Sequence, residues 1–228
     1  MRPVLTDNPP THGRRFKESS LAQAWLVLVL AVCFGISLAA VQVTLSAKIA
    51  RNKLNETLEK IPELVGGSPG TARAAAQRSA LLIVPGNFSV TSNSKTDTYS
   101  LYQVSREQQL AGWVIKAGGQ GYADKIELLV GLDPQVASVT GLFVLDQKET
   151  PGLGNKIALP GWRRQFVGKS TAHPLVVVKG GPVAANAIDA VTGATISSRS
   201  VARIVNRVMA AARGRLKTGS VNLTQRQP

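Results

Sequence analysis

A long uncharged stretch near the N-terminus constrains this chain more than any other feature. No Asp, Glu, Lys or Arg occurs from Ser19 to Ala47, where most residues are Leu, Val, Ala, Ile or Phe. A helix that spans a bilayer needs about 20 apolar residues, whereas the apolar core of a cleavable signal peptide has about 7 to 15. The sequence therefore predicts one N-terminal transmembrane helix over residues 21–47, with signal-peptide cleavage after the small residues at 46 and 47 as the lesser alternative.

The basic residues around this helix do not indicate its orientation in the membrane. Four precede it and four follow it: Arg2, Arg14, Arg15 and Lys17, then Lys48, Arg51, Lys53 and Lys60. Orientation depends on an asymmetry of Lys and Arg between the two sides of a membrane helix. Charge alone therefore leaves the side of the following domain open.

The net charge of +14 would suit a protein that binds nucleic acid. The basic residues are scattered, however, and no nucleic-acid fold or aromatic stacking motif accompanies them. We therefore expect no nucleic-acid partner and ascribe the charge to anionic membrane lipid, an acidic partner subunit or solubility.

Residue usage also argues against a metal centre. Cys33 is the only cysteine, so the chain forms no internal disulfide and holds no zinc or iron–sulfur cluster through cysteines. The two histidines, His12 and His173, are far apart in the sequence. We expect no metal site.

The remaining sequence predicts a single α+β domain between short flanking segments. We expect a polar tail over residues 1–20, a stalk and linker over 48–70 with Pro62 ending or kinking the helix, a domain over 71–217, and a tail over 218–228. Strands are predicted at residues 98–105, 110–117, 125–132, 136–145 and 175–179. A short helix is expected from Pro160 and an amphipathic one from Ser198. The predicted fold is a mainly antiparallel sheet with flanking helices, preceded by one transmembrane helix.

The segment from Asp189 to Ser197 combines hydroxyl groups with small residues just before the last predicted helix. Ser197 or Ser198 would serve as the N-cap, so free backbone N–H groups and hydroxyls would gather at a positive helix end. Such an end suits a phosphate group. An ordinary capped helix start is the alternative, because the same residues also favour turns and caps.

This segment resembles the flavinylation motif of the FMN-binding domain family. That motif reads Asp, two variable positions, Ser or Thr, Gly-Ala-Thr, one variable position, and Ser or Thr. The matching residues are Asp189, Thr192, Gly193, Ala194, Thr195 and Ser197. The resemblance implies that Thr195 carries FMN covalently through a phosphoester, formed by a separate flavin transferase with FAD as donor. It makes Thr195 an attachment point rather than a catalytic residue. We expect Thr192, Ser197 and Ser198 to hold the phosphate.

A second segment, Glu149-Thr150-Pro151-Gly152-Leu153-Gly154, strengthens the resemblance. It is similar to a signature of the G-type component of Rnf electron-transport complexes and of the C-type component of sodium-pumping NADH:quinone oxidoreductases. Proline and glycine fix a tight loop whose main chain can approach a flat ring. We expect Glu149, Thr150, Gly152 and Leu153 to line a flavin-ring pocket, with a purely structural loop as the alternative. Tyr122 could flank the ring, but a core or strand-end position is favoured.

The resemblance implies a single-pass protein of the bacterial inner membrane with its flavin domain on the periplasmic side. It would relay electrons within an Rnf-type ion-translocating complex, with the other subunits, the flavin transferase and membrane lipid as partners. One alternative is the C-type component of a sodium-pumping NADH:quinone oxidoreductase. Another is a non-redox, membrane-anchored assembly or binding subunit in which Thr195 belongs only to a helix start.

Overall fold

The computed structural model describes residues 15–66, 81–92, 95–181, 184–216 and 222–223. The chain divides into two units, Met1–Leu54 and Asn55–Pro228, which are described separately below. Predictions for the N-terminal tail before residue 15, for the linker at 67–70 and for most of the C-terminal tail lie outside the described residues.

Within the first unit, the described residues form the larger part of helix α1, Arg15–Gly66. This is the one described helix that is long and apolar enough to cross a membrane. Polar side chains in the apolar part bond to the helix's own backbone: Ser37 Oγ donates to the carbonyl of Cys33 (2.8 Å) and Thr44 Oγ1 to that of Ala40 (2.9 Å). Such internal bonds satisfy hydroxyl groups where water is absent.

The sequence predicts that Pro62 ends or kinks the helix, and the first of these is wrong, because α1 continues to Gly66. A proline so close to the end of a helix removes only one hydrogen bond near its last turn. The residues around Pro62 are held by packing, because Ile61 and Leu64 are buried in the second unit. The compact unit accordingly begins at Asn55, whereas the sequence predicts a domain from residue 71.

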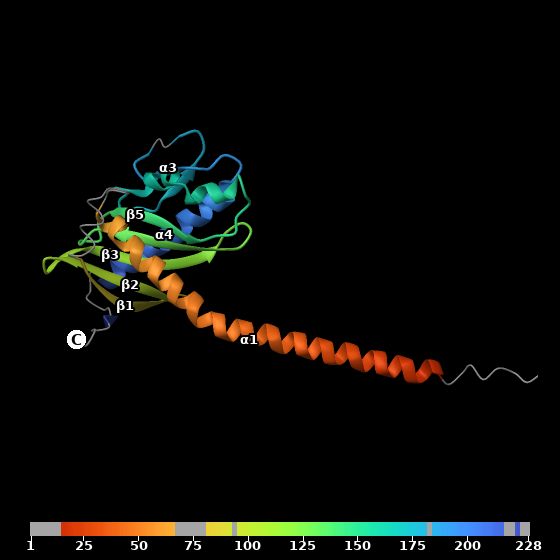
Figure 1. Cartoon of the computed structure of the whole chain (residues 1–228). Coiled ribbons are helices and arrows are strands. Elements are labelled where there is room, and N and C mark those ends of the chain that lie inside the picture. Colours follow the sequence, from red (N-terminus) through yellow and green to blue (C-terminus); the bar gives the residue numbers. More distant parts are fainter. Residues whose placement is uncertain (1–14, 67–80, 93–94, 182–183, 217–221, 224–228) are drawn as a thin grey trace, which may run out of the picture. The chain divides into compact units, whose positions relative to one another are not determined.

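The second unit is built on an antiparallel sheet with the strand order β5-β4-β3-β2-β1-β8 (Figure 1). The strands are β1 Leu81–Ser92, β2 Lys95–Arg106, β3 Gln109–Gln120, β4 Lys125–Leu132, β5 Val139–Asp146 and β8 Asn222–Leu223. Glu107 and Gln108 join β2 to β3 with positive φ angles of 51° and 64°. Such angles are typical of two-residue hairpins that match the twist of the strands.

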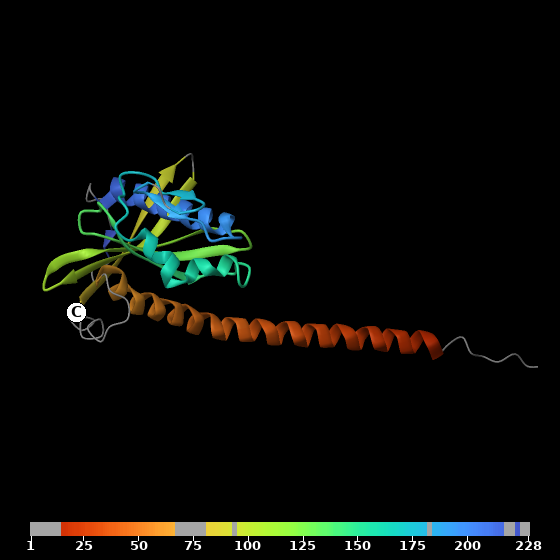
Figure 2. The same cartoon turned by 90° about the horizontal axis from the view of Figure 1, so that it is seen from above.

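Alternating side chains give this sheet two buried faces. In β4, Ile126 and Leu128 face the core that contains helix α4, Thr195–Leu216, while Leu129 faces the end of α1 with Ile61 and Leu64. Successive side chains of a strand point to opposite faces, so a strand buried on both faces is apolar at consecutive positions. Figure 2 shows α4 on one face and the end of α1 on the other.

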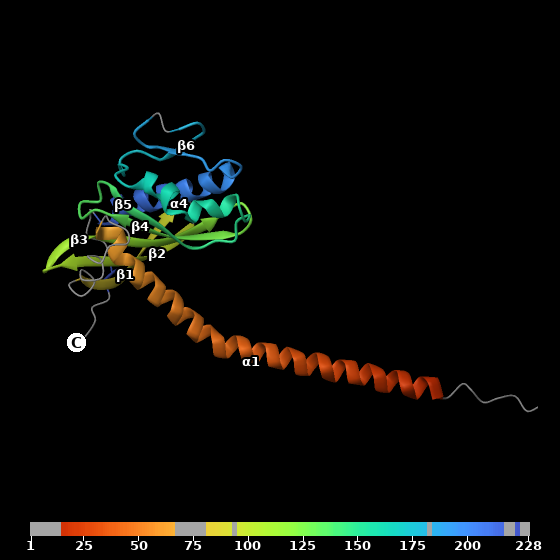
Figure 3. The ribbon, with the colours of Figure 1, turned by 45° about the horizontal axis from the view of Figure 1, so that its top comes forward.

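Short elements connect the sheet to α4. Three helical segments, η1 Gly154–Ala158, α3 Pro160–Arg163 and η2 Arg164–Phe166, pack against the edge strand β5. Two short parallel strands follow, β6 Val176–Val178 and β7 Ala187–Asp189. Strand β6 also packs against α4, as Figure 3 shows.

The predicted fold class is confirmed: the second unit is α+β with a mainly antiparallel sheet, and an apolar N-terminal helix precedes it. Three of the described strands escaped the sequence analysis. Strand β1 contains Pro85 and Gly86, which conceal its pattern, whereas β7 has only three residues and β8 only two.

Candidate functional site

A cavity of about 890 Å³ opens where the start of α4 meets the loop at 149–154 and the ends of β6 and β7. Ligand pockets in proteins are commonly about 300 to 1,000 Å³. Both sequence segments with the family resemblance contribute to its walls. The lining residues are Tyr122, Thr150, Leu153, Gly154, Lys179, Gly180 and the run from Asp189 to Ser197.

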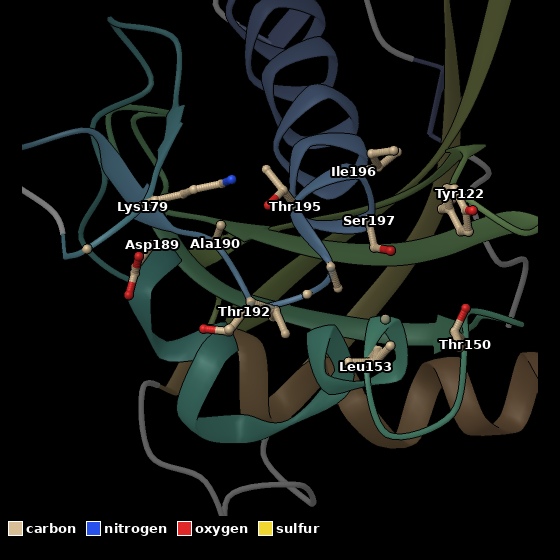
Figure 4. A pocket seen from close by; sticks show the side chains of 15 residues that line it. Tyr122, Thr150, Leu153, Lys179, Asp189, Ala190, Thr192, Thr195, Ile196 and Ser197 are labelled. Atoms are coloured by element: carbon tan, nitrogen blue, oxygen red, sulfur yellow. The ribbon is translucent and has the colours of Figure 1, made fainter.

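The turn between β7 and α4 places Thr195 at the N-terminal end of α4. The N–H of Ala190 donates to the carbonyl of Val178 (2.8 Å), and that of Ala194 donates to the carbonyl of Val191 (2.9 Å). Helix α4 then begins at Thr195. Figure 4 shows the Thr195 side chain at the cavity, on the side of Lys179. The N–H groups of the first helical turn have no acceptor within the helix, so they make this end of α4 positive.

The prediction of Ser197 or Ser198 as N-cap is wrong, because α4 begins earlier and both serines lie in its first turn. Ser198 is fully buried, and its hydroxyl donates to the carbonyl of Ala194 (3.0 Å) and accepts from the N–H of Val191 (3.0 Å). It does not line the cavity. The hydroxyl of Ser198 therefore stabilises the turn between β7 and α4 through two hydrogen bonds.

Gly193 has the backbone conformation that this turn requires. Its φ angle is +80°, in the region that residues with a side chain rarely adopt. A Cβ atom at this position would also lie 2.9 Å from Cδ2 of Leu153. Gly193 thus lets the two resemblance segments approach each other across the cavity.

Glu149 is a structural clamp beside the cavity. Its side chain is buried, at 3% exposure. Oε1 accepts the N–H groups of Tyr122 (3.0 Å) and Ala123 (3.1 Å), while Oε2 accepts the hydroxyl of Ser197 (2.5 Å). One carboxylate therefore joins the loop at 121–124, its own loop and the first turn of α4. Neither Glu149 nor Gly152 is among the residues that line the cavity.

The loop at 121–124 is fixed further by Asp124. Its backbone carbonyl accepts the N–H of Gly121 (2.9 Å), and its exposed carboxylate accepts the N–H of Lys125 (2.7 Å) and pairs with Lys148 (3.1 Å). The hydrogen bond from Lys125, together with the hydrogen bond and charge of Lys148, lowers the pKa of Asp124.

Asp189 is held mainly through its backbone. Its carbonyl accepts the indole N–H of Trp162 (2.8 Å), and its N–H donates to the side-chain carbonyl of Gln165 (2.7 Å). Its carboxylate accepts the N–H of Gly181 (3.3 Å). The segment α3–η2 thus sets the position from which the turn to Thr195 begins.

Two residues of the cavity were misjudged or missed in the sequence. Of the two favoured positions for Tyr122, core or strand end, the core is wrong, because the residue is 63% exposed and lines the cavity shortly after the end of β3. Lys179 follows β6, and Figure 4 shows its ammonium group on the same side of α4 as Thr195. Only the pairing of β6 with β7 brings Lys179 to Asp189, and no spacing in the sequence reveals that pairing.

Across the described residues, no group of three His, Cys, Asp or Glu side chains could hold a metal ion. The chemistry that the cavity offers is that of hydroxyl groups, backbone N–H groups, one ammonium group and an apolar rim.

Comparison with known proteins relates the region around the cavity to a cofactor-binding family. The sequence model of the FMN-binding domain matches residues 121–210, which include both resemblance segments and most of α4. This stretch is similar to FMN-binding domains. It contributes all the residues that line the cavity.

Relatives that match this chain are subunits of ion-translocating oxidoreductases. The G-type component of the Na⁺-translocating ferredoxin:NAD⁺ oxidoreductase complex of Acetobacterium woodii is 41% identical over 100 residues, covering 43% of this chain and 47% of the relative. The C-type component of the Na⁺-translocating NADH-quinone reductase of Vibrio anguillarum is 32% identical over 114 residues, covering 47% of this chain and 45% of the relative. The chain spans about half the length of these relatives.

Among solved structures, NqrC of Shewanella oneidensis resembles this chain with a TM-score of 0.56, covering 70% of this chain and 93% of that one. The sequences are 19% identical, so the likeness concerns the fold.

Proposed function

We propose that this chain is a membrane-anchored flavoprotein subunit that carries FMN covalently on Thr195. It would relay electrons within an Rnf-type ion-translocating complex. The observation that carries the proposal is the place of Thr195, a cavity residue at the positive end of α4 within a fully matched flavinylation motif. The match of residues 121–210 to the FMN-binding domain model supports the choice of cofactor.

The residues of the cavity fit the two chemically different parts of FMN. Its phosphate would meet the first N–H groups of α4 and the ammonium group of Lys179, both favourable to a negative charge. The absence of a Cβ at Gly193 leaves room beside Leu153. Exposed apolar groups of Tyr122, Leu153 and Ile196, all at the cavity, would cover part of the ring.

The flavin supplies one- and two-electron redox chemistry that protein side chains lack. The chain's own contribution would be position. A phosphoester at Thr195 keeps the cofactor from diffusing away, which matters in a compartment without a pool of free FMN. Glu149 and Gly193 would hold the shape of the cavity around it.

We place the flavin domain on the periplasmic side of a bacterial inner membrane, anchored once through residues 21–47. The exposed apolar side chains of that part of α1 support contact with lipid. The other subunits of the complex and a flavin transferase complete the proposed set of partners.

The C-type component of a sodium-pumping NADH:quinone oxidoreductase is the second candidate. The fold likeness to NqrC and the 32% identity to the Vibrio anguillarum relative favour it, whereas the higher identity of 41% to the Acetobacterium woodii relative favours the first. Affinity purification from native membranes separates the two, because each complex has its own set of co-purifying subunits. A purified chain without flavin would support the non-redox alternative.

Intact mass spectrometry of the full chain, produced together with a flavin transferase, tests the attachment. We expect a mass increase of one FMN less one water, which Thr195→Ala abolishes and Thr195→Ser retains. Fragmentation of the tryptic peptide 180–199 should locate the adduct at Thr195. An unchanged mass in the wild type, or an adduct at Thr192, would contradict the proposal. The unfolding midpoint of each variant controls for loss of the fold.

A further inference from the structure

A second cavity, of about 590 Å³, lies between β6 and α4 on the surface of the second unit. Its α4 side carries Arg199, Arg203 and Arg207, and its β6 side carries Leu175, Val176 and Val177. No residue that lines it is acidic. The cavity is thus a groove with an apolar wall and a basic wall.

The three arginines form a row because residues four apart lie on one face of a helix. Arg207 is engaged: it lies 3.9 Å from the carboxylate of Asp97 and donates to the carbonyl of Gly118 (3.1 Å). Arg199 and Arg203 are exposed and, within the described part of the chain, have no carboxylate within 4 Å. Like charges at this spacing destabilise a helix. A bound anion would therefore reduce the repulsion between the guanidinium groups of Arg199 and Arg203.

The backbone of β6 offers hydrogen bonds to the same groove. Val176 donates its N–H to the carbonyl of Asn186, and the carbonyl of Val178 accepts from Ala190, so these two residues face β7. Leu175 faces the opposite way, where the side chain of Asn206 accepts its N–H (2.7 Å) and donates to its carbonyl (3.0 Å).

Backbone groups of alternate residues point to the same edge of a strand. Val177 therefore directs its N–H and carbonyl toward the side on which Asn206 meets Leu175. Among the described strands, β6 pairs with β7 alone. The Asn206 amide thus occupies the place of a neighbouring strand at Leu175 and leaves the next position, at Val177, open to a strand from elsewhere.

We propose that this groove binds an extended acidic segment of another protein, which adds to β6 as a strand and sets carboxylates against Arg199 and Arg203. Strand addition supplies main-chain hydrogen bonds, and side-chain pockets supply the selectivity. Paired carboxylate and guanidinium groups form strong, directional contacts. The exposed side chain of Val176 would pack against an apolar residue of the incoming segment.

Sequence composition argues that the segment comes from another protein. The residues outside the described ranges include a single acidic one, Asp7. A second copy of this chain, with a net charge of +14, is electrostatically unsuited to the groove. Arg199 lies one helical turn beyond Thr195, so the bound partner would stand next to the flavin site.

Photo-cross-linking in native membranes tests the proposal with the full chain. A photoreactive amino acid at Val176 should yield an adduct with an Asp- and Glu-rich segment of another protein, identified by mass spectrometry. Arg199→Glu with Arg203→Glu should reduce the adduct about tenfold or more, as expected for a loss of about 1.4 kcal/mol of binding free energy. An adduct with lipid, with this chain, or with a neutral or basic segment would overturn the proposal, as would the absence of any adduct.

The matched control is Lys156→Glu with Arg164→Glu, which makes the same change in net charge at exposed residues outside the groove. This pair should leave the adduct unchanged, and equal loss in both pairs would indicate general charge attraction. Arg199→Gln with Arg203→Gln is a milder variant in case the reversal unfolds the domain, and it should still weaken the adduct.

A binding assay with purified full-length chain separates strand addition from simple charge attraction. The probe is a fluorescent peptide of alternating Glu and Val. We expect saturable binding that is lost when alternate backbone nitrogens of the peptide are methylated. Equal binding of the methylated peptide, or preferential binding of phosphatidylglycerol vesicles or single-stranded DNA by the same arginines, would overturn it. The binding does not require flavin, so Thr195→Ala should bind the probe like the wild type, whatever the outcome for the proposed function.

Discussion

The two segments that meet at the cavity beside Thr195 use their characteristic residues in opposite ways. In the segment from Asp189 to Ser197, the central residues line the cavity and Thr195 stands at its mouth. In the segment from Glu149 to Gly154, the carboxylate is buried beside the cavity and bonds to three groups of the protein. A short motif can therefore mark residues that serve a ligand and residues that serve the fold.

The difference follows from what each side chain can do when buried. A carboxylate taken from water is costly unless several donors satisfy it, and Glu149 has backbone and hydroxyl donors. A threonine hydroxyl at the start of a helix remains accessible because the turn before it consists of small residues. The comparison predicts that variants of the first segment affect cofactor attachment, whereas variants of Glu149 affect stability.

Glu149→Ala should give the largest loss of stability. It leaves the N–H groups of Tyr122 and Ala123 and the hydroxyl of Ser197 without their acceptor. Leaving the buried hydroxyl of Ser197 unsatisfied would cost about 1 to 3 kcal/mol, and the two part-buried N–H groups would cost less, because water can reach them. We therefore expect a loss of about 2 to 4 kcal/mol in the free energy of unfolding, measured by denaturant titration. Thr150→Ala, at the exposed neighbour, should stay within about 0.5 kcal/mol. Similar losses of stability in Glu149→Ala and Thr150→Ala would contradict the structural role given to Glu149.

Each of the two segments contains a glycine with left-handed backbone, and this pair sharpens the comparison at matched conformation. Gly193 and Gly152 have φ angles of +80° and +74°. Alanine should cost about 1 to 2 kcal/mol of stability at either position, because a Cβ is strained there. The surroundings differ. A Cβ at Gly193 would lie 2.9 Å from Cδ2 of Leu153, whereas a Cβ at Gly152 would have no atom within 4 Å apart from its chain neighbours.

Only Gly193→Ala should therefore also hinder flavin attachment, since it displaces a side chain that lines the cavity. The measurement is the flavin content per chain after co-production with the transferase, beside the unfolding midpoint. Equal flavin content in both variants would show that the approach of Leu153 does not matter.

Sequence patterns predicted the apolar helix, the strands at 98–105, 110–117 and 125–132, and the last helix because each has a long, regular repeat. They also brought the two motif segments together, since a ligand common to both requires it. They could not predict that the Glu149 side chain is buried beside the cavity and does not line it. The burial of Glu149 depends on the loop at 121–124, which is distant in the sequence.

The start of α4 and the place of Lys179 were missed for a related reason. Serine favours the N-cap position on local grounds, but here Ser198 bonds to Val191 from inside the first turn. Lys179 reaches the cavity through a three-residue parallel pairing, which is too short to leave a pattern. Tertiary contacts, rather than local preference, decide both.

A hydroxyl pair tests the comparison within a single segment. Ser198 is buried and bonds only to the protein, whereas Thr192 is exposed and lines the cavity. Ser198→Ala should cost about 1 kcal/mol of stability, because the N–H of Val191 loses its acceptor, and should leave flavin content unchanged. Thr192→Ala should leave stability unchanged and lower the flavin content. A loss of flavin in Ser198→Ala, with the fold intact, would assign this serine to the ligand after all.

Asp124→Asn should give the smallest effect, and its pH dependence identifies the cause. The hydrogen bond from Lys125 and the charge of Lys148 lower the pKa of the folded carboxyl below the ordinary value of 3.8. Ionised Asp124 therefore stabilises the fold above that value, and the contribution disappears as the pH falls through the folded pKa.

The two proteins should differ slightly in unfolding midpoint at neutral pH and converge in acid, and salt at about 1 M should reduce the difference because the group is exposed. A difference that persists in acid would mean that Asp124 acts through shape rather than charge. Asp124 would then, like Glu149, hold the loop at 121–124 through its geometry. The residues that support the fold, and not the ligand, would in that case include one at the outer edge of the cavity.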